Sequence, residues 1–257
     1  EFGIYSLNFA KENVFPQYLD AIKTVGVYPS GYLGTVNPAN GALELYDGEM
    51  RMMDMNGNYD QFKPEDYQDH IAEHVEPWSY LKFPYMKKAG GIKLDETDPQ
   101  GVYRVNCLAR INVADEMATP LAQKELEIFR SAFGRPAHPT LLYHYARLIE
   151  LVQAAERAEE LLNDPDITGP EHRVQPIEPK AGEGVGQIEA PRGTLIHHYK
   201  TDDEGMVTMA NLVVATGHNN AGMNLGIKQA AKVLIKDGKY DQGIMNTIEM
   251  TVRAYDP

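Results

Sequence analysis

The chain lacks most of the features that would mark it as secreted, metal-binding or nucleic-acid-binding. Cys107 is the only cysteine among 257 residues, which excludes an internal disulfide and a multi-thiolate metal site built by this chain alone. Acidic residues outnumber basic ones by 37 to 24, so the formal charge of −13 disfavours nucleic acid and anionic membrane surfaces as partners. No apolar run approaches the ~18 residues of a membrane span. The composition therefore predicts a soluble globular chain, and its single cysteine favours a reducing compartment.

Neither end of the sequence reads as a natural terminus. The first residue is Glu1, and no basic segment followed by an apolar stretch comes after it, so we expect no secretory signal. The last five residues, 253–257, form neither a polar tail nor a helix stop. We expect a piece cut at both ends that forms a single partial domain over residues 1–257.

The residue pattern predicts an α+β fold that is dominated by helices and carries small β-hairpins. Helices are expected at 17–25, 66–75, 121–133, 139–162, 221–235 and 243–254, with the third and fourth forming an antiparallel pair. Hairpins are expected at 43–55, around Asp47-Gly48, and at 194–216, with a further turn at Asn56-Gly57 and an extended segment at 102–113. The chain thus divides into a mixed part (1–63), a helical part (64–165) and a part with a loop, a hairpin and C-terminal helices (166–257), the loop covering 163–183.

Two motifs suggest chemistry that their context does not favour. His70 and His74 stand four apart on a predicted helix, the spacing at which two imidazoles can share a metal, yet the order differs from the His-Glu-x-x-His of zinc hydrolases. An ordinary solvated helix face is the simpler interpretation. The glycine-rich run at 182–186 follows a proline-rich loop instead of a strand, so we interpret it as a flexible connector and not as a phosphate-binding loop.

Two other segments are harder to dismiss. Arg192 stands between Pro191 and Gly193, so its guanidinium can be aimed from a rigid turn at an anion or a developing negative charge. The alternative is a surface salt bridge with Glu189. The segment 213–220 places Thr216, His218, Asn219 and Asn220 at the junction of a strand and a helix, where they could face a ligand. Equally, Asn219 or Asn220 could simply cap the helix.

These segments, read in order, resemble the large subunit of nickel-iron hydrogenases. The resemblance lies in three runs, GVGQIEAPRGTLIHHY (184–199), NLVVATGHNN (211–220) and EMTVRAYDP (249–257). Two upstream runs, IAEHVEPWSYLKF (71–83) and LAR (108–110), resemble the cytoplasmic branch of that family, which exchanges electrons with NAD, coenzyme F420 or a heterodisulfide reductase. The resemblance covers nearly the whole chain and implies a truncated, large-subunit-like scaffold.

The resemblance implies roles for individual residues. In the family, cysteine thiolates bridge a nickel and an iron that bears CN and CO ligands, and H2 is split heterolytically. Arg192 matches the arginine suspended over the metals, and Asp256 matches the carboxylate that pairs with it. Pro191, Arg192 and Thr216 match positions around the cyanide ligands, and the backbone carbonyl of Leu212 matches a ligand of a structural magnesium. We expect Glu189, His218 and Asn219 to have supporting roles.

The chain departs from the family at its metal ligands. The family uses two Cys-x-x-Cys pairs, and neither is present here; Cys107 lies in a different motif and is expected to be a buried apolar residue. Arg, Thr and Asp cannot replace four thiolates, so the fragment is expected to bind no metal by side chain and to be inactive alone.

The resemblance also implies partners and a compartment. The parent enzyme is expected to be cytoplasmic and to pair with a diaphorase or reductase module and with an iron-sulfur small subunit, whereas exposed apolar helix faces are expected to make the fragment self-associate. The alternative is a non-catalytic structural or interaction module derived from the same scaffold. Arg192, Thr216 and Asp256 favour the truncated enzyme, since a repurposed scaffold has no reason to keep them.

Overall fold

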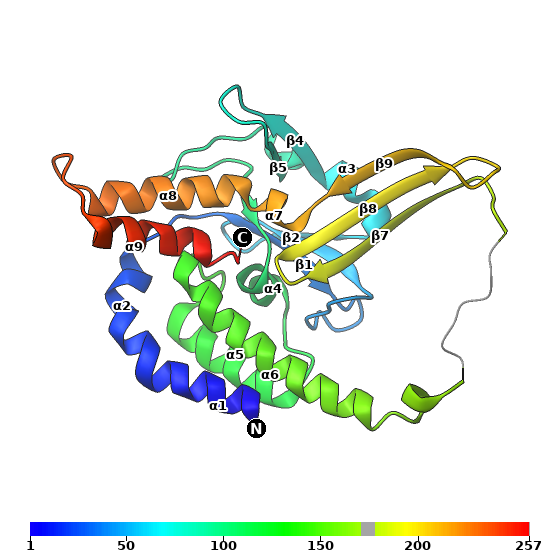
Figure 1. The fold of residues 1–257 in the computed structure, drawn as a ribbon, viewed down its shortest axis with the longest axis horizontal. Helices are drawn as coiled ribbons and strands as arrows, with labels where there is room; N and C mark the ends of the chain where they lie inside the picture. The colour runs from blue at the N-terminus through cyan, green and yellow to red at the C-terminus, as the bar shows by residue number, and fades with distance from the viewer. Residues whose placement is uncertain (171–177, 257) are drawn as a thin grey trace.

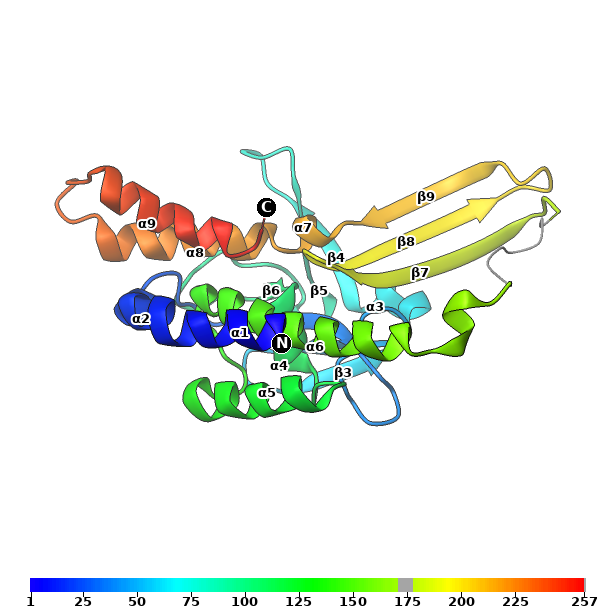
Figure 2. The ribbon, with the colours of Figure 1, turned by 60° about the horizontal axis from the view of Figure 1, so that its bottom comes forward.

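The structure is a computed structural model that describes residues 1–170 and 178–256. Figure 1 shows helices and three separate sheets, with one long sheet that projects away from the helices. Figure 2 shows the helical layers beneath that sheet and the paired C-terminal helices beside it. The predicted α+β class is confirmed. The described part of the chain also contains strands inside the stretch 64–165, which was expected to be helical.

A four-stranded sheet in the order β3-β2-β1-β6 lies at the centre. β1 (Gly31–Val36) is buried along its whole length and pairs antiparallel with β2 (Glu49–Met53), which pairs in turn with β3 (Tyr59–Phe62). β6 (Tyr103–Arg104) adds a short parallel edge. The turn at Asn56-Gly57 joins β2 to β3 as predicted, but the hairpin at 43–55 is wrong, because β2 pairs with β1 and Leu43 makes only an isolated bridge to Val36.

The helix α4 (Cys107–Val113) contradicts the extended segment expected at 102–113. All seven of its residues are buried, packed against β1 and the neighbouring helices, so no polar face gives the sequence a helical period. Asn106 starts the helix in a left-handed backbone conformation (φ 85°), and its side chain accepts a hydrogen bond from the Cys107 amide.

Four helices form the layer that covers this core. They are α1 (Phe2–Phe9), which continues through the π-helical turn η1 (Ala10–Val14) into α2 (Phe15–Thr24), and the helices α5 (Pro120–Phe133) and α6 (Tyr143–Leu162), which pack together. The helices expected at 17–25, 121–133 and 139–162 are therefore confirmed, whereas α1 was missed. Glu156 of α6 accepts hydrogen bonds from the amides of Leu121 and Ala122, so α6 caps the first turn of α5.

The helix expected at 66–75 is wrong. After the 3-10 turn η2 (Pro64–Asp66), α3 (Tyr67–His70) lasts only one turn, and the chain continues as β4 (Ile71–Val75), which pairs antiparallel with β5 (Lys82–Met86). Residues four apart share a face in a strand as well as in a helix, so the spacing of Ile71 and Val75 did not distinguish the two; in the strand Ile71 is buried and Val75 is exposed.

The C-terminal part carries the third sheet and three helices. β7 (Gly182–Ala190), β8 (Gly193–Thr201) and β9 (Val207–Val213) form an antiparallel sheet, followed by α7 (Ala215–His218), α8 (Asn220–Leu234) and α9 (Gln242–Arg253). The hairpin of 194–216 and the last two helices are confirmed. The connector interpretation of 182–186 is wrong, because these glycines are strand residues; of the loop expected at 163–183, residues 171–177 lie outside the described residues.

Candidate functional site

The turn that carries Arg192 is held from three sides. Pro191 and Arg192 form a two-residue connection between β7 and β8, closed by the pair Ala190 and Gly193. Arg110 of α4 donates a hydrogen bond to the carbonyl of Ala190 at 3.1 Å. Gly193 has φ 123°, and a β-carbon there would lie 2.6 Å from the Asn106 nitrogen, so only glycine fits against the start of α4. The backbone beneath Arg192 is therefore fixed.

Arg192 reaches from this turn to the C-terminal end of the described chain. Its Nε donates a hydrogen bond to the backbone carbonyl of Asp256 and lies 3.8 Å from Oδ2 of the same residue. The side chains are 46% and 55% exposed, so the ion pair itself contributes little to stability. Figure 1 shows the C-terminus beside the β7–β8 turn.

α7 brings the third predicted group to the same place. Asn219, directly after α7, is buried; its Oδ1 accepts from the Val105 amide at 2.9 Å, and its Nδ2 donates to the Arg192 carbonyl at 3.4 Å. Thr216 lies on α7, and its carbonyl accepts from the Asn219 amide at 3.0 Å. The structure therefore gathers Arg192, Asp256 and the helix bearing Thr216 around one turn. Asn219 does occupy the N-cap position of α8, as the alternative expected, but its side chain makes no capping hydrogen bond.

His218, another of the predicted supporting residues, is fully buried. Its Nδ1 shares a hydrogen bond with the Tyr103 hydroxyl, while its Nε2 has no hydrogen-bond partner among the described residues. Burial lowers the pKa of His218 to about 4, so the ring is neutral at physiological pH.

Glu189 does not pair with Arg192, which corrects one of the two sequence interpretations. Its side chain is fully buried and accepts from Arg110 Nη1 at 3.1 Å, and Arg110 also binds Glu150 of α6. Arg110 was predicted only as part of a motif and its partners were missed, since nothing local links residues 110, 150 and 189. An arginine in a helix that is apolar apart from Asn112 is the signal that could have pointed to buried carboxylates.

The remaining predicted residues lie elsewhere. Leu212 is on β9, opposite His197, and the magnesium role of its carbonyl stays a prediction. His70 and His74 do not share a helix face: the His70 ring stacks on Phe62, and His74 Nε2 bonds Glu76 at 3.2 Å from a strand. Within residues 1–170 and 178–256, no three His, Cys, Asp or Glu side chains are arranged to hold a metal ion.

The residues present do not fit a nickel-iron centre. Cys107 is fully buried, its Sγ donates to the Tyr143 carbonyl at 3.1 Å, and burial raises its pKa to about 12. Metal binding needs the thiolate, so this cysteine is a packed apolar residue, and a site built on several thiolates cannot be assembled from these 257 residues.

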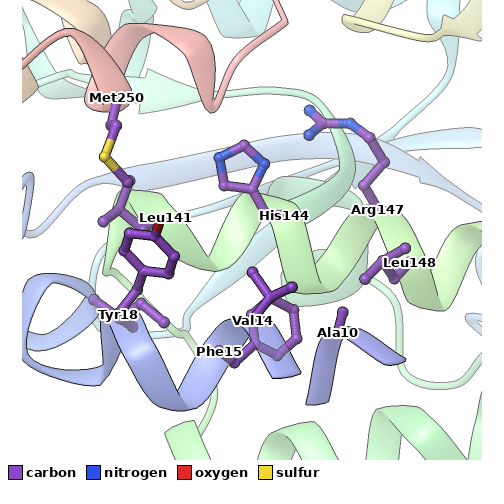
Figure 3. A pocket seen from close by; sticks show the side chains of 10 residues that line it. Ala10, Val14, Phe15, Tyr18, Leu141, His144, Arg147, Leu148 and Met250 are labelled. Atoms are coloured by element: carbon purple, nitrogen blue, oxygen red, sulfur yellow. The ribbon is translucent and has the colours of Figure 1, made fainter. Parts of the chain in front are cut away.

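An apolar hollow lies away from the Arg192 turn. It is an apolar pocket of about 420 Å³ between α2, α6 and α9, shown in Figure 3. Phe15, Tyr18 and Met250 line it together with Leu141, Leu148 and the polar side chains His144 and Arg147. Its lining is suited to packing against apolar side chains, and none of the predicted site residues contributes to it.

Comparison with known proteins identifies relatives over almost the whole chain. No protein-family model matches. The chain is 47% identical to an F420-non-reducing hydrogenase subunit of Methanothermobacter thermautotrophicus over 248 residues, covering 95% of this chain and 50% of the relative. It is 45% identical to the NAD-reducing hydrogenase HoxS subunit beta of Cupriavidus necator over 220 residues, covering 84% and 43%. The chain thus spans about half the length of the curated relatives it matches.

The solved structures with a similar fold are also hydrogenases. The NAD+-reducing [NiFe]-hydrogenase in the H2-reduced state superposes with a TM-score of 0.87 and 38% identity, covering 99% of this chain and 55% of that one. The Ni-Fe-Se hydrogenase of Desulfovibrio vulgaris Hildenborough shares the fold, with a TM-score of 0.67 at 21% identity. The large-subunit-like scaffold expected from the resemblance is therefore confirmed. None of the helices in the described part of the chain is both long and apolar enough to cross a membrane.

Proposed function

Because the chain is homologous to hydrogenase subunits and has the fold of the nickel-iron hydrogenase large subunit, we propose that it forms part of the catalytic large subunit of such an enzyme. The proposed activity is the reversible oxidation of H2 and reduction of protons. The observation that carries the proposal is the meeting of Arg192, Asp256 and the Thr216 helix around one fixed turn.

The proposed roles follow from the chemistry of these groups. Arg192 presents a planar, permanently charged fork from a rigid backbone, which suits stabilisation of a polarised reactant. Asp256 limits the freedom of that guanidinium. Pro191 and Thr216 would flank the cyanide ligands, where a hydroxyl can donate a hydrogen bond to a cyanide nitrogen.

The sequence holds one cysteine, which cannot supply the several thiolates of a nickel-iron cluster. We therefore propose that the chain supplies the wall of the site and that cysteines from further sequence hold the cluster. On that interpretation the 257 residues alone are inactive and central to a longer subunit. The missing thiolates equally suit a non-catalytic module derived from the same scaffold. Nickel and iron bound by the complete protein would exclude that second interpretation.

The partners are proposed from the relatives. One relative is named as NAD-reducing and another as F420-non-reducing, so we propose a cytoplasmic enzyme with a soluble electron carrier and an iron-sulfur small subunit. In the chain alone, the apolar pocket of Figure 3 and the exposed apolar residues of α1 and α2 are proposed to drive self-association. These residues include Phe2, Tyr5, Phe9, Tyr18 and Leu19.

The test replaces Arg192 by Lys in the complete large subunit, in complex with its partners. Lysine keeps the charge but presents a mobile point charge, so we expect H2-dependent dye reduction to fall by at least ~100-fold while nickel and iron contents stay unchanged. Arg253→Lys is the matched control, because Arg253 is 58% exposed on α9 and pairs only with Glu249 of the same helix among the described residues. Equal turnover by both variants would refute the assignment.

A further inference from the structure

A buried cluster of three charged side chains lies beneath the Arg192 turn. Arg110 donates from Nε and Nη2 to the two oxygens of Glu150, at 2.7 and 2.6 Å, and from Nη1 to Glu189 Oε2 at 3.1 Å. The three side chains are 5%, 15% and 0% exposed. If both carboxyl groups are ionised, the cluster carries one unbalanced negative charge away from water, which is costly. One added proton would make the cluster neutral.

A count of the hydrogen-bond protons around Glu189 also indicates one added proton. Glu189 Oε1 lies 2.7 Å from the Thr194 hydroxyl and 2.9 Å from the Thr35 hydroxyl, and the Thr35 hydroxyl also lies 2.9 Å from Gln187 Oε1. Three oxygen–oxygen contacts each need one proton, but the two hydroxyl groups supply only two. A proton on Glu189 Oε1 provides the third: the acid donates to Thr35, and Thr35 donates to Gln187.

From these two counts we propose that Glu189 is a proton-binding site that holds its proton at neutral pH. The Thr35 hydroxyl turns toward Gln187 when the acid is protonated and toward Glu189 when it is ionised, so only the protonated state places a proton in all three contacts. Burial also raises the pKa of Glu189. The groups that face Glu189 are Arg110 of α4, Thr35 of β1, Gln187 of β7 and Thr194 of β8, with Glu150 of α6 behind Arg110.

The position of Glu189 places this proton between solvent and the Arg192 turn. Gln187 lines an open polar hollow of about 600 Å³ whose wall also carries Glu49 and Lys63. On the other side, Arg110 holds both Glu189 and the carbonyl of Ala190, two residues before Arg192. The protonation of Glu189 stands without the proposed function; a part in proton exchange during H2 chemistry rests on it.

A second buried carboxyl group, that of Glu96, is surrounded by more positive than negative charges. The Glu96 side chain is 4% exposed, but two cations, Lys228 and Lys232, face it. The hydrogen bond from Lys232 is the main cause that lowers the pKa of Glu96 to about 2. Glu96 is therefore ionised at neutral pH and does not contribute a protonated carboxyl signal.

Infrared spectroscopy of the chain in H2O and D2O tests the proposal. At pH 7 we expect the C=O absorption of a protonated carboxylic acid, which lies above the amide I band and shifts on deuteration. Glu189→Gln should abolish it, and should fold because the amide is isosteric with the protonated acid. Glu150→Gln leaves Arg110 with one carboxylate, so the midpoint of the band should move to lower pH by about 1 unit or more. Glu249→Gln, at an exposed Arg–Glu pair, should change nothing.

Two outcomes would overturn the proposal. Either the unmodified chain shows no protonated carboxyl absorption at pH 7, in which case a turned Gln187 amide supplies the third proton, or the absorption persists undiminished in Glu189→Gln. Should that variant fail to fold, 13C NMR of the glutamate-labelled unmodified chain decides: one carboxyl carbon must remain at its protonated shift at pH 7. Both readouts measure a charge state and need no metal, so their failure is distinct from a failure of the proposed hydrogenase activity.

Discussion

Gly193→Ala is the substitution that tests how firmly the Arg192 turn is held. At φ 123° any side chain is strained, which costs about 1–3 kcal/mol. The added β-carbon would also lie 2.2 Å from Val105 Cγ2 and 2.6 Å from the Asn106 nitrogen. The valine methyl could rotate away, but the backbone nitrogen cannot, so overpacking adds about 1–3 kcal/mol. We expect the free energy of unfolding to fall by about 2–6 kcal/mol, a large share of a typical domain's stability.

Urea unfolding followed by circular dichroism measures this change, with Gly184→Ala as the matched control. Gly184 lies in the same hairpin, on β7, and a β-carbon there meets nothing within 4 Å, so its substitution should stay within about 0.5 kcal/mol. Equal unfolding midpoints for the two variants would show that the turn accommodates a β-carbon without a loss of stability, and Arg192 would then not be held on a fixed backbone.

Two further predictions concern buried titratable groups. The pKa of His218 is lowered to about 4, against about 6.5 in the unfolded chain. Between these two pH values the unfolded chain therefore binds more protons than the folded chain. As the pH falls through that window, the free energy of unfolding should decrease by about 1.4 kcal/mol per pH unit because of this histidine. Urea midpoints of His218→Gln should therefore depend less on pH than those of the unmodified chain, and identical slopes would contradict the burial argument. Burial raises the pKa of Cys107 to about 12, so a chromogenic disulfide reagent should label it only on unfolding; labelling of the native chain at the rate of the denatured chain would contradict this.

Amphipathic helices were the part of the fold that the sequence made predictable. α5, α6 and α9 each bury one stripe and expose the rest, so their apolar residues repeat with the helical period. Asp241, whose side chain accepts from the Ile244 amide, also marks the start of α9. Local pattern and tertiary environment agree in these elements, and their boundaries were found to within a few residues.

Prediction failed where burial or tertiary pairing removed the period. α4 is buried on all sides, so its residues show no polar face and resemble a strand. The glycines of β7 have low strand propensity, but nine register pairs with β8 determine their conformation. In the same way β4 continues from α3 without a turn signal, because its partner β5 is what makes it a strand.

In the candidate site, too, some residues were predicted from local motifs and others were missed because they pair over long distances in the sequence. Arg192, Thr216 and Asp256 were identified because their motifs resemble a family, and the structure brings the segments that carry them together. The pairing of Arg110 with Glu150 and Glu189 joins residues 40 and 79 positions apart, and no local pattern encodes which carboxylate meets a buried arginine.

The ion pair with Asp256 cannot by itself fix the Arg192 guanidinium, whose placement depends also on the backbone of the turn and on the hydrogen bond to the Asp256 carbonyl. A half-exposed pair with Asp256 contributes at most about 1 kcal/mol, which cannot hold a long, flexible side chain by itself. The backbone on either side is fixed by the buried Arg110, which binds Ala190, and by Asn219, which binds the Arg192 carbonyl. Hydrogen bonds from a charged group in a buried setting are the stronger kind. A loss of Arg110 should therefore disturb the Arg192 turn more than a loss of Asp256, although it is Asp256 that bonds the arginine side chain.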